Sequence, residues 1–136
     1  MKKNKKNGFT LFELLVVISI IGIIVAAGFA SYSSAQKRAR DAKRKQDVGQ
    51  AHEALEQYYA VNAAYPAASC NPGNDYLPGG LPTDPKNDDT YSYDDWSCDT
   101  TAYCICARLE ATTGNASDAS CTWSSGGDYY CLQNVQ

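Results

Sequence analysis

The stretch Gly8-Phe9-Thr10-Leu11-Phe12-Glu13 decides the fold of this chain, because it joins a basic leader to a long apolar run. The leader, residues 1–7, carries four lysines and no acid, and residues 14–30 carry no charged side chain. As a helix, residues 9–30 would be about 33 Å long, which is enough to cross a hydrocarbon core of about 30 Å. The lysines favour a cytoplasmic N-terminus, so the rest of the chain is expected outside the cytoplasm.

Glu13 is the only charged residue between positions 8 and 30, and a lone carboxylate at membrane depth needs a partner. A cleaved secretory signal peptide also has a basic leader, an apolar stretch and small residues at the cut, here near Gly28 or Ala30. That interpretation and a plain membrane anchor both leave Glu13 unexplained. The helical character of the residues after Ala30 further disfavours a signal peptide.

The basic leader, Gly8, the Phe9–Glu13 string and the aliphatic run together resemble the class III signal of type IV pilins and type II secretion pseudopilins. The resemblance implies that a membrane prepilin peptidase cuts between Gly8 and Phe9 and methylates the new amine of Phe9. It also places Glu13 at the family's glutamate position, where the carboxylate neutralises the amine of the next subunit in a filament. One departure is the absence of a late proline in the apolar segment, which here has Gly28 and Ala30.

Residues 31–62 contain no proline and favour helix. We expect one helix from Phe9 to Asn62, with a membrane half at 9–30 and an amphipathic half at 31–62. The basic cluster at 37–45, which includes Arg44, is expected to be a solvated face that pairs with acids of neighbouring subunits; a nucleic-acid patch is the alternative. The expected apolar positions recur at three- and four-residue steps: Ala35, Ala39, Ala42, Val48, Ala51, Leu55, Tyr58 and Tyr59.

The composition changes after residue 65, and residues 63–136 are expected to form a separate head domain. From Pro66 onward the chain has ten acids, two bases and all five prolines, which mark 66–90 as a long loop. Strands are expected at 90–93, 101–109 and 128–135, with a weak fourth at 120–124 and a hairpin turn at Gly126-Gly127. The expected fold class is α+β, a pilin-like roll in which the long helix packs on a small antiparallel sheet.

Six cysteines lie in this head and none elsewhere, which predicts three disulfides outside the cytoplasm. Fifteen pairings are possible. Neighbours on one strand face, Cys104 and Cys106 should bond to different partners, and Cys121 with Cys131 is a plausible bridge across a hairpin. A zinc site is the weaker alternative. The six positions are Cys70, Cys98, Cys104, Cys106, Cys121 and Cys131.

The string Leu81-Pro82-Thr83-Asp84-Pro85 resembles the proline-aspartate loop of major pseudopilins. That resemblance implies calcium bound by a nearby acidic loop, whose carboxylates are the hard oxygen ligands that calcium prefers. A solvated acidic loop without an ion is the alternative. The candidate ligands are Asp84, Asp88, Asp89, Asp94 and Asp95.

These patterns predict a structural subunit of a type IV pilus, with adhesion, motility or DNA uptake as its work. A major pseudopilin of a type II secretion system is the alternative, and a secreted or anchored disulfide-rich domain is the third. The expected partners are identical subunits, the prepilin peptidase, an inner-membrane assembly platform, and DNA or a surface ligand. No nucleophile elbow, phosphate loop or histidine cluster indicates an enzyme or a small-molecule substrate. The chain is expected in the inner membrane first and in an extracellular pilus afterwards.

Overall fold

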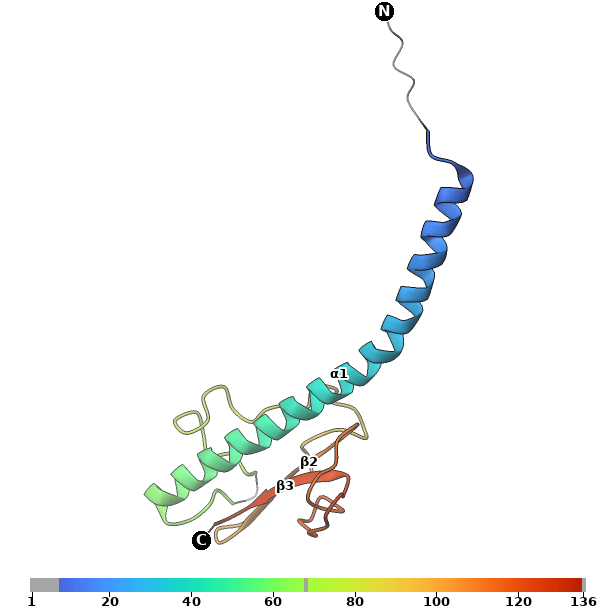
Figure 1. The fold of residues 1–136 in the computed structure, drawn as a ribbon. Coiled ribbons are helices and arrows are strands. Elements are labelled where there is room, and N and C mark those ends of the chain that lie inside the picture. The colour runs from blue at the N-terminus through green and yellow to red at the C-terminus, as the bar shows by residue number, and fades with distance from the viewer. Residues whose placement is uncertain (1–7, 68, 136) are drawn as a thin grey trace, which may run out of the picture. The chain divides into compact units, whose positions relative to one another are not determined.

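The computed structural model describes residues 8–67 and 69–135. It divides the chain into two compact units, residues 1–35 and 36–136. One long helix and a three-stranded sheet confirm the expected α+β class (Figure 1). The elements are α1 (Leu11–Asn62), β1 (Ser97–Cys98), β2 (Tyr103–Arg108) and β3 (Tyr129–Gln133).

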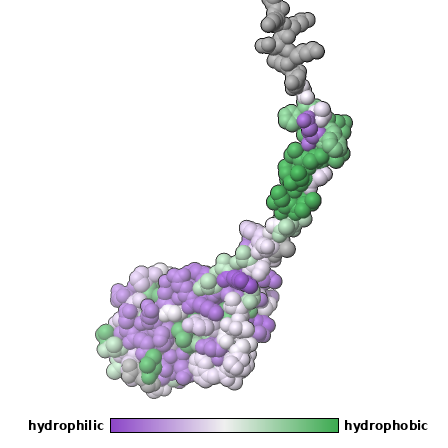
Figure 2. Space-filling view, viewed as in Figure 1, coloured by the Kyte–Doolittle hydropathy of each residue, from purple (hydrophilic) through white to green (hydrophobic). Residues whose placement is uncertain are grey.

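The described part of the first unit is the N-terminal portion of α1 with three residues before it, and its apolar side chains are exposed. Phe9 is 83% exposed, Ile23 72% and Phe29 71%. By length and composition, α1 contains a stretch that can cross a membrane. Figure 2 shows this stretch as a mainly hydrophobic surface, whereas the visible face of the second unit is mostly polar. The exposed apolar helix therefore needs a partner that the single chain does not supply.

The second unit is built on an antiparallel sheet with the strand order β1-β2-β3. Successive side chains of a strand point to opposite faces. Tyr103, Ile105 and Ala107 of β2 pack toward α1, while Cys104 and Cys106 contact the loop between β2 and β3. The sheet is thus covered by the helix on one face and by a loop on the other.

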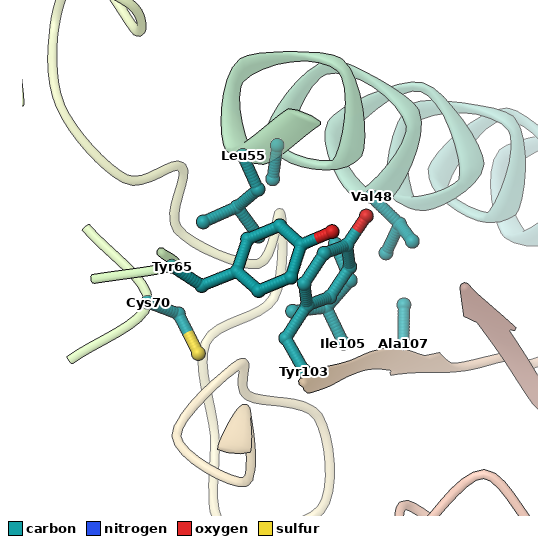
Figure 3. Packing of buried hydrophobic residues seen from close by; sticks show 8 residues of the cluster. Val48, Leu55, Tyr65, Cys70, Tyr103, Ile105 and Ala107 are labelled. Atoms are coloured by element: carbon teal, nitrogen blue, oxygen red, sulfur yellow. The ribbon is translucent and has the colours of Figure 1, made fainter. Parts of the chain in front are cut away.

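The core lies between α1 and β2, where Val48 and Leu55 of the helix meet Ile105 of the strand (Figure 3). All three side chains are fully buried. The rings of Tyr65 and Tyr103 extend this core in an edge-to-face contact, with 4.8 Å between centroids. Aromatic rings therefore supply much of the packing in a domain with few aliphatic residues.

The two stronger expected strands correspond to β2 and β3, but residues 90–93 and 120–124 are not strands. Each contains one residue of an isolated bridge instead, and the short β1 forms one edge of the sheet. Cys121 has a left-handed backbone (φ 56°), which interrupts an extended run at 120–124. The loop packs so tightly that a Cβ at Gly114 would lie 1.8 Å from the Tyr129 carbonyl oxygen and one at Gly127 1.9 Å from that of Ala116. Only glycine permits this approach.

Helix α1 ends at Asn62, as the sequence predicts. Ala63 adopts the left-handed conformation (φ 54°) and donates its N–H to the carbonyl of Tyr59 at 2.8 Å. Asn62 Nδ2 donates to the carbonyl of Tyr58 at 3.0 Å. These bonds satisfy backbone groups that a helix end leaves open, which explains why the helix stops before the proline-rich loop.

Candidate functional site

A capping box closes the start of the apolar helix. Because α1 begins at Leu11, Thr10 is its N-cap residue. The backbone N–H and the hydroxyl of Thr10 both donate to Glu13 Oε2 at 2.8 Å, and Glu13 N–H donates to Thr10 Oγ1 at 3.2 Å. The T-x-x-E spacing is the sequence signal for this arrangement, and reasoning from charge alone missed it. The carboxylate thus has one partner within its own chain.

The same carboxylate stays open to a second partner. Glu13 is exposed, and its Oε1 accepts no hydrogen bond from any described residue. Phe9, also exposed, is four positions earlier in the chain. A carboxylate oxygen of this kind can accept a charge-assisted hydrogen bond from an ammonium group of another molecule.

Gly8 lies in open space. A Cβ at this position would meet no atom within 4 Å, so the packing of the described chain does not require glycine there. Its backbone carries no left-handed conformation that would demand glycine either. The leader before it, residues 1–7, lies outside the described residues. Cleavage between Gly8 and Phe9 therefore remains a prediction that rests on the motif.

The basic segment of α1 differs from its expected solvated form, because Arg44 is fully buried. Its guanidinium donates to both oxygens of Asp84 (2.6 and 3.0 Å), to Asp41 (2.9 Å) and to Glu110 (2.7 Å). Arg40 donates to both oxygens of Glu110 at 2.6 Å. The expectation that these arginines pair with neighbouring subunits is wrong, since their acids belong to the same chain.

Position on the helix explains the burial of Arg44. Residues 41, 44, 48, 51 and 55 follow three- and four-residue steps and share one face. The expected apolar stripe is confirmed at positions 48, 51 and 55, which are buried, but it is wrong at Ala35, Ala39 and Ala42, which are all exposed. Ala39 is nine residues before the core residue at 48, which places it half a turn away at 100° per residue. The core face therefore continues into charged residues.

Asp41 ties α1 to the loop after β2. Its Oδ1 accepts the backbone N–H of Glu110 at 2.8 Å, and its Oδ2 accepts those of Ala111 and Thr112 at 2.8 and 3.0 Å. Burial acts to raise the pKa of Asp41, but these bonds and Arg44 hold it below its ordinary value. The buried carboxylate therefore stays ionised and fixes the loop to the helix.

Glu110 and Asp84 are held ionised by the same cluster. The hydrogen bonds from Arg40 lower the pKa of Glu110 to about 2, because they and those from Arg44 outweigh the effect of burial. For Asp84, burial acts to raise the pKa, but the guanidinium of Arg44 and two backbone N–H groups bring it below the ordinary value. Through these bonds, two loops that are distant from α1 in the sequence are held against the helix.

The structure does not support the expected calcium site. Asp84 is committed to Arg44, and Asp88 pairs with Lys86 at 2.8 Å. Within residues 8–67 and 69–135, the one group of cysteine, histidine or acidic side chains close enough to share an ion consists of cysteines. These sulfurs, of Cys104, Cys106 and Cys121, are already in disulfides. Two of the five candidate acids are thus engaged in ion pairs, and Asp89, Asp94 and Asp95 are exposed.

All six cysteines form disulfides, as expected from their number. Cys104 and Cys106 do bond to different partners, but the suggested Cys121–Cys131 bridge is wrong. Cys106 and Cys131 face each other in the β2–β3 register with Cα atoms 4.1 Å apart, so they bond directly. The three bridges are Cys70–Cys98, Cys104–Cys121 and Cys106–Cys131.

Comparison with known proteins agrees with this geometry. Residues 3–29 match the prokaryotic N-terminal methylation motif. The chain is 33% identical over 73 residues to the fimbrial protein EcpC of Eikenella corrodens (54% of this chain, 48% of the relative). It is 36% identical over 67 residues to the type II secretion system core protein G of Pseudomonas aeruginosa (49% and 47%). The chain spans about half the length of these two relatives.

A longer match reaches into the head. The core protein G of Vibrio cholerae is 32% identical over 107 residues, which covers 68% of this chain and 73% of the relative. No solved structure matches the chain. The long helix, the small antiparallel sheet and the methylation motif define a pilin-like protein. The chain belongs to the type IV pilin and type II secretion pseudopilin family, whose members are structural subunits.

Proposed function

We propose that this chain is the precursor of a filament subunit. Prepilin peptidase removes residues 1–8 and methylates the amine of Phe9, and the mature subunits then pack their apolar helices together. The observation that carries the proposal is an apolar helix whose side chains are exposed, with an accessible carboxylate at its start. The buried surface that this helix lacks within its own chain comes first from the membrane and then from other copies.

Glu13 acts in this proposal as the docking group between copies. Cleavage after Gly8 gives Phe9 an amine that is protonated near neutral pH. In the membrane, Thr10 satisfies one oxygen of Glu13; in the filament, the other oxygen accepts the ammonium of a neighbouring Phe9. A buried carboxylate and a buried ammonium are tolerable as a pair, whereas either alone is strongly unfavourable.

Replacing Glu13 separates the charge from the cap. In Glu13→Gln the amide oxygen still accepts the capping bonds of Thr10, but the negative charge is lost. We expect both Glu13→Gln and Glu13→Ala to be cut and methylated normally, as mass spectrometry of the N-terminus will report, and to form no filaments by electron microscopy. The matched control is Glu53→Ala, which removes an exposed acid from the part of α1 that belongs to the second unit, and it should assemble normally.

Two outcomes would overturn the docking role. Normal filaments from Glu13→Gln would mean that the cap, and not the charge, is what assembly needs. An N-terminus of the wild-type chain that begins at Gly28 or Ser31 instead of at Phe9 would restore a secreted domain. Both readouts come from the same strains.

The pilus is our first candidate filament. Three disulfides cross-link the head, which is typical of domains that remain outside the cell. One of the relatives is also a fimbrial protein. The pseudopilus is the second candidate, because the longest of the three matches, over 107 residues, is to a type II secretion core protein. Deleting the gene distinguishes them: loss of surface fibres supports the pilus, and loss of protein secretion with intact fibres supports the pseudopilus.

A further inference from the structure

The head carries a hollow of about 310 Å³. This volume is at the lower end of the range for small-molecule sites, about 300–1,000 Å³. It is formed by the loop between α1 and β1. None of its lining residues belongs to the capping box or to the Arg44 cluster. The residues that give it chemical character are Ser69, Thr83, Asn87, Tyr93, Asp94 and Trp96.

Four polar side chains of the hollow, apart from its two aromatic residues, have no hydrogen-bond or ion-pair partner among the described residues. Thr83, Asn87 and Asp94 make no side-chain hydrogen bond or ion pair with any of them, in contrast to the acids at 84 and 88. The same holds for the hydroxyl of Ser69. Two hydroxyls, an amide and a carboxylate therefore offer both donors and acceptors within one small space.

The aromatic residues of the hollow are fixed in place. The rings of Tyr93 and Trp96 stack with 5.1 Å between centroids and 18° between planes. Tyr93 donates its hydroxyl to Asp47 at 3.1 Å, and Trp96 Nε1 donates to the carbonyl of Cys106 at 2.7 Å. Because their polar tips are already engaged, the two side chains contribute apolar ring surface to the hollow.

We infer that this hollow binds a single ring of a neutral carbohydrate. A sugar presents hydroxyls that both donate and accept, which matches the amide of Asn87 and the carboxylate of Asp94, and C–H groups that pack on aromatic rings. An anionic ligand is disfavoured, because Asp94 lines the hollow and no basic side chain of the described part of the chain does. A quaternary ammonium is disfavoured too, since stacked rings form one wall and not the cage that such cations prefer.

The test uses the full chain in a polyoxyethylene detergent, whose headgroup is neither a sugar nor charged. Glucose, galactose and N-acetylglucosamine are titrated to about 100 mM, above the millimolar Kd expected for so small a site. The indole N–H signals of Trp96 and Trp123 are followed by NMR and assigned with Trp123→Phe. We expect a saturable shift of the Trp96 signal with at least one sugar and none for Trp123, which does not line the hollow.

Two variants decide whether the hollow is the site. Asp94→Ala should weaken binding about tenfold or more, because it removes a charged acceptor. Asp95→Ala, at the exposed neighbour outside the hollow, should leave binding unchanged. No saturable shift with any of the three sugars, equal loss in both variants, or stronger binding of sialic acid or tetramethylammonium would overturn the inference. Binding is measured on dispersed chains, so failure of filament assembly does not affect the result.

Discussion

The two units of this chain treat apolar surface in opposite ways. Every described side chain from residue 8 to residue 35 is exposed, although most of residues 14–30 are aliphatic. In the second unit, by contrast, Val48, Leu55 and Ile105 are fully buried, and three disulfides close the domain. The surroundings therefore determine the stability of the first unit, whereas the second unit holds itself together.

The acids of the two units follow the same division. Glu13 is exposed and accepts hydrogen bonds from a single residue, so it remains open to another molecule. Asp41 and Asp84 are buried and committed to Arg44 in the same chain. The acid at the start of the apolar helix is thus available for assembly, whereas the buried acids of the second unit stabilise its own fold.

The largest expected effect comes from removing Arg44, the buried cation of the second unit. Arg44→Met leaves the carboxylates of Asp41 and Asp84 without their guanidinium, whereas Glu110 keeps that of Arg40. Breaking a buried ion pair in this way typically lowers stability by about 3–5 kcal/mol. We expect the midpoint of urea unfolding, followed by circular dichroism with the disulfides intact, to fall accordingly. The matched control is Arg38→Met, at an exposed arginine on the same helix, which should change stability by less than about 0.5 kcal/mol.

Equal urea midpoints for Arg44→Met and Arg38→Met would contradict the view that the second unit is held together by its own contacts. They would mean that the head does not depend on its internal ion pairs, and that Arg44 is available to other subunits after all. Arg44→Lys sharpens the result, because a lysine keeps the charge but cannot form the forked contact with Asp84. We expect it to fall between wild type and Arg44→Met.

The next effect tests the bridge between the long loop and the sheet. The double variant Cys70→Ser, Cys98→Ser opens a loop that spans a sequence separation of 28 residues. Loop-closure entropy for that length predicts a loss of about 3–4 kcal/mol. Urea unfolding of the oxidised double variant checks this value. A loss confined to the N-terminal portion of α1, with the head midpoint unchanged, would show that the bridge does not support the second unit.

Features that depend on neighbouring residues or on composition could be predicted from the sequence. The apolar run and the end of α1 at Asn62 follow from composition and local propensity, and β2 and β3 follow from strand-forming residues. The number of disulfides followed from the number of cysteines. The capping box of Thr10 and Glu13 was equally local, and its spacing predicts it once it is looked for.

Features that depend on distant partners were not readable. Arg44 looked like a surface residue because Asp84 and Glu110 are 40 and 66 positions away in the sequence. Only the folded loops bring these acids to the helix. The pairing of Cys131 likewise depends on the β2–β3 register, which composition does not specify. The hollow beside Trp96 exists only after the long loop has folded.

A smaller effect concerns acid. The pKa of Glu110 is lowered to about 2, so its contribution to stability is complete above the unfolded pKa near 4.5 and is lost as the pH falls toward 2. Asp41 and Asp84 change in the same direction. We expect a loss from Glu110 of about 2 kcal/mol across this window, less than the full shift implies because Arg40 is partly exposed.

The control for the acid effect is Glu110→Gln, which cannot titrate. Its absolute stability is lower, but the slope of stability against pH between 4.5 and about 2 should be shallower than in the wild type. Urea midpoints at a series of pH values give both slopes. Identical slopes would assign the acid sensitivity to other carboxylates, for example the exposed Asp99, whose pKa is also lowered by hydrogen bonds from Thr101.

The smallest effect lies at the other end of the comparison, in the first turn of α1. Thr10→Ala removes the hydroxyl that donates to Glu13 and accepts its N–H, so the first turn should fray. Loss of an N-cap predicts about fivefold faster hydrogen exchange at the amides of Glu13 and Leu14, which both bond to Thr10, in detergent micelles. Thr10→Ser keeps the hydroxyl and is the matched control.

The head provides the internal reference for this last measurement. The hydrogen bonds of Thr10 all lie within the first turn, so amides of β2 and β3 should exchange at the wild-type rate. Faster exchange in the sheet would mean that the first turn supports the second unit, which contradicts the division between the two. Unchanged exchange at Glu13 would mean that the micelle itself holds the turn, in which case the surroundings control even the cap.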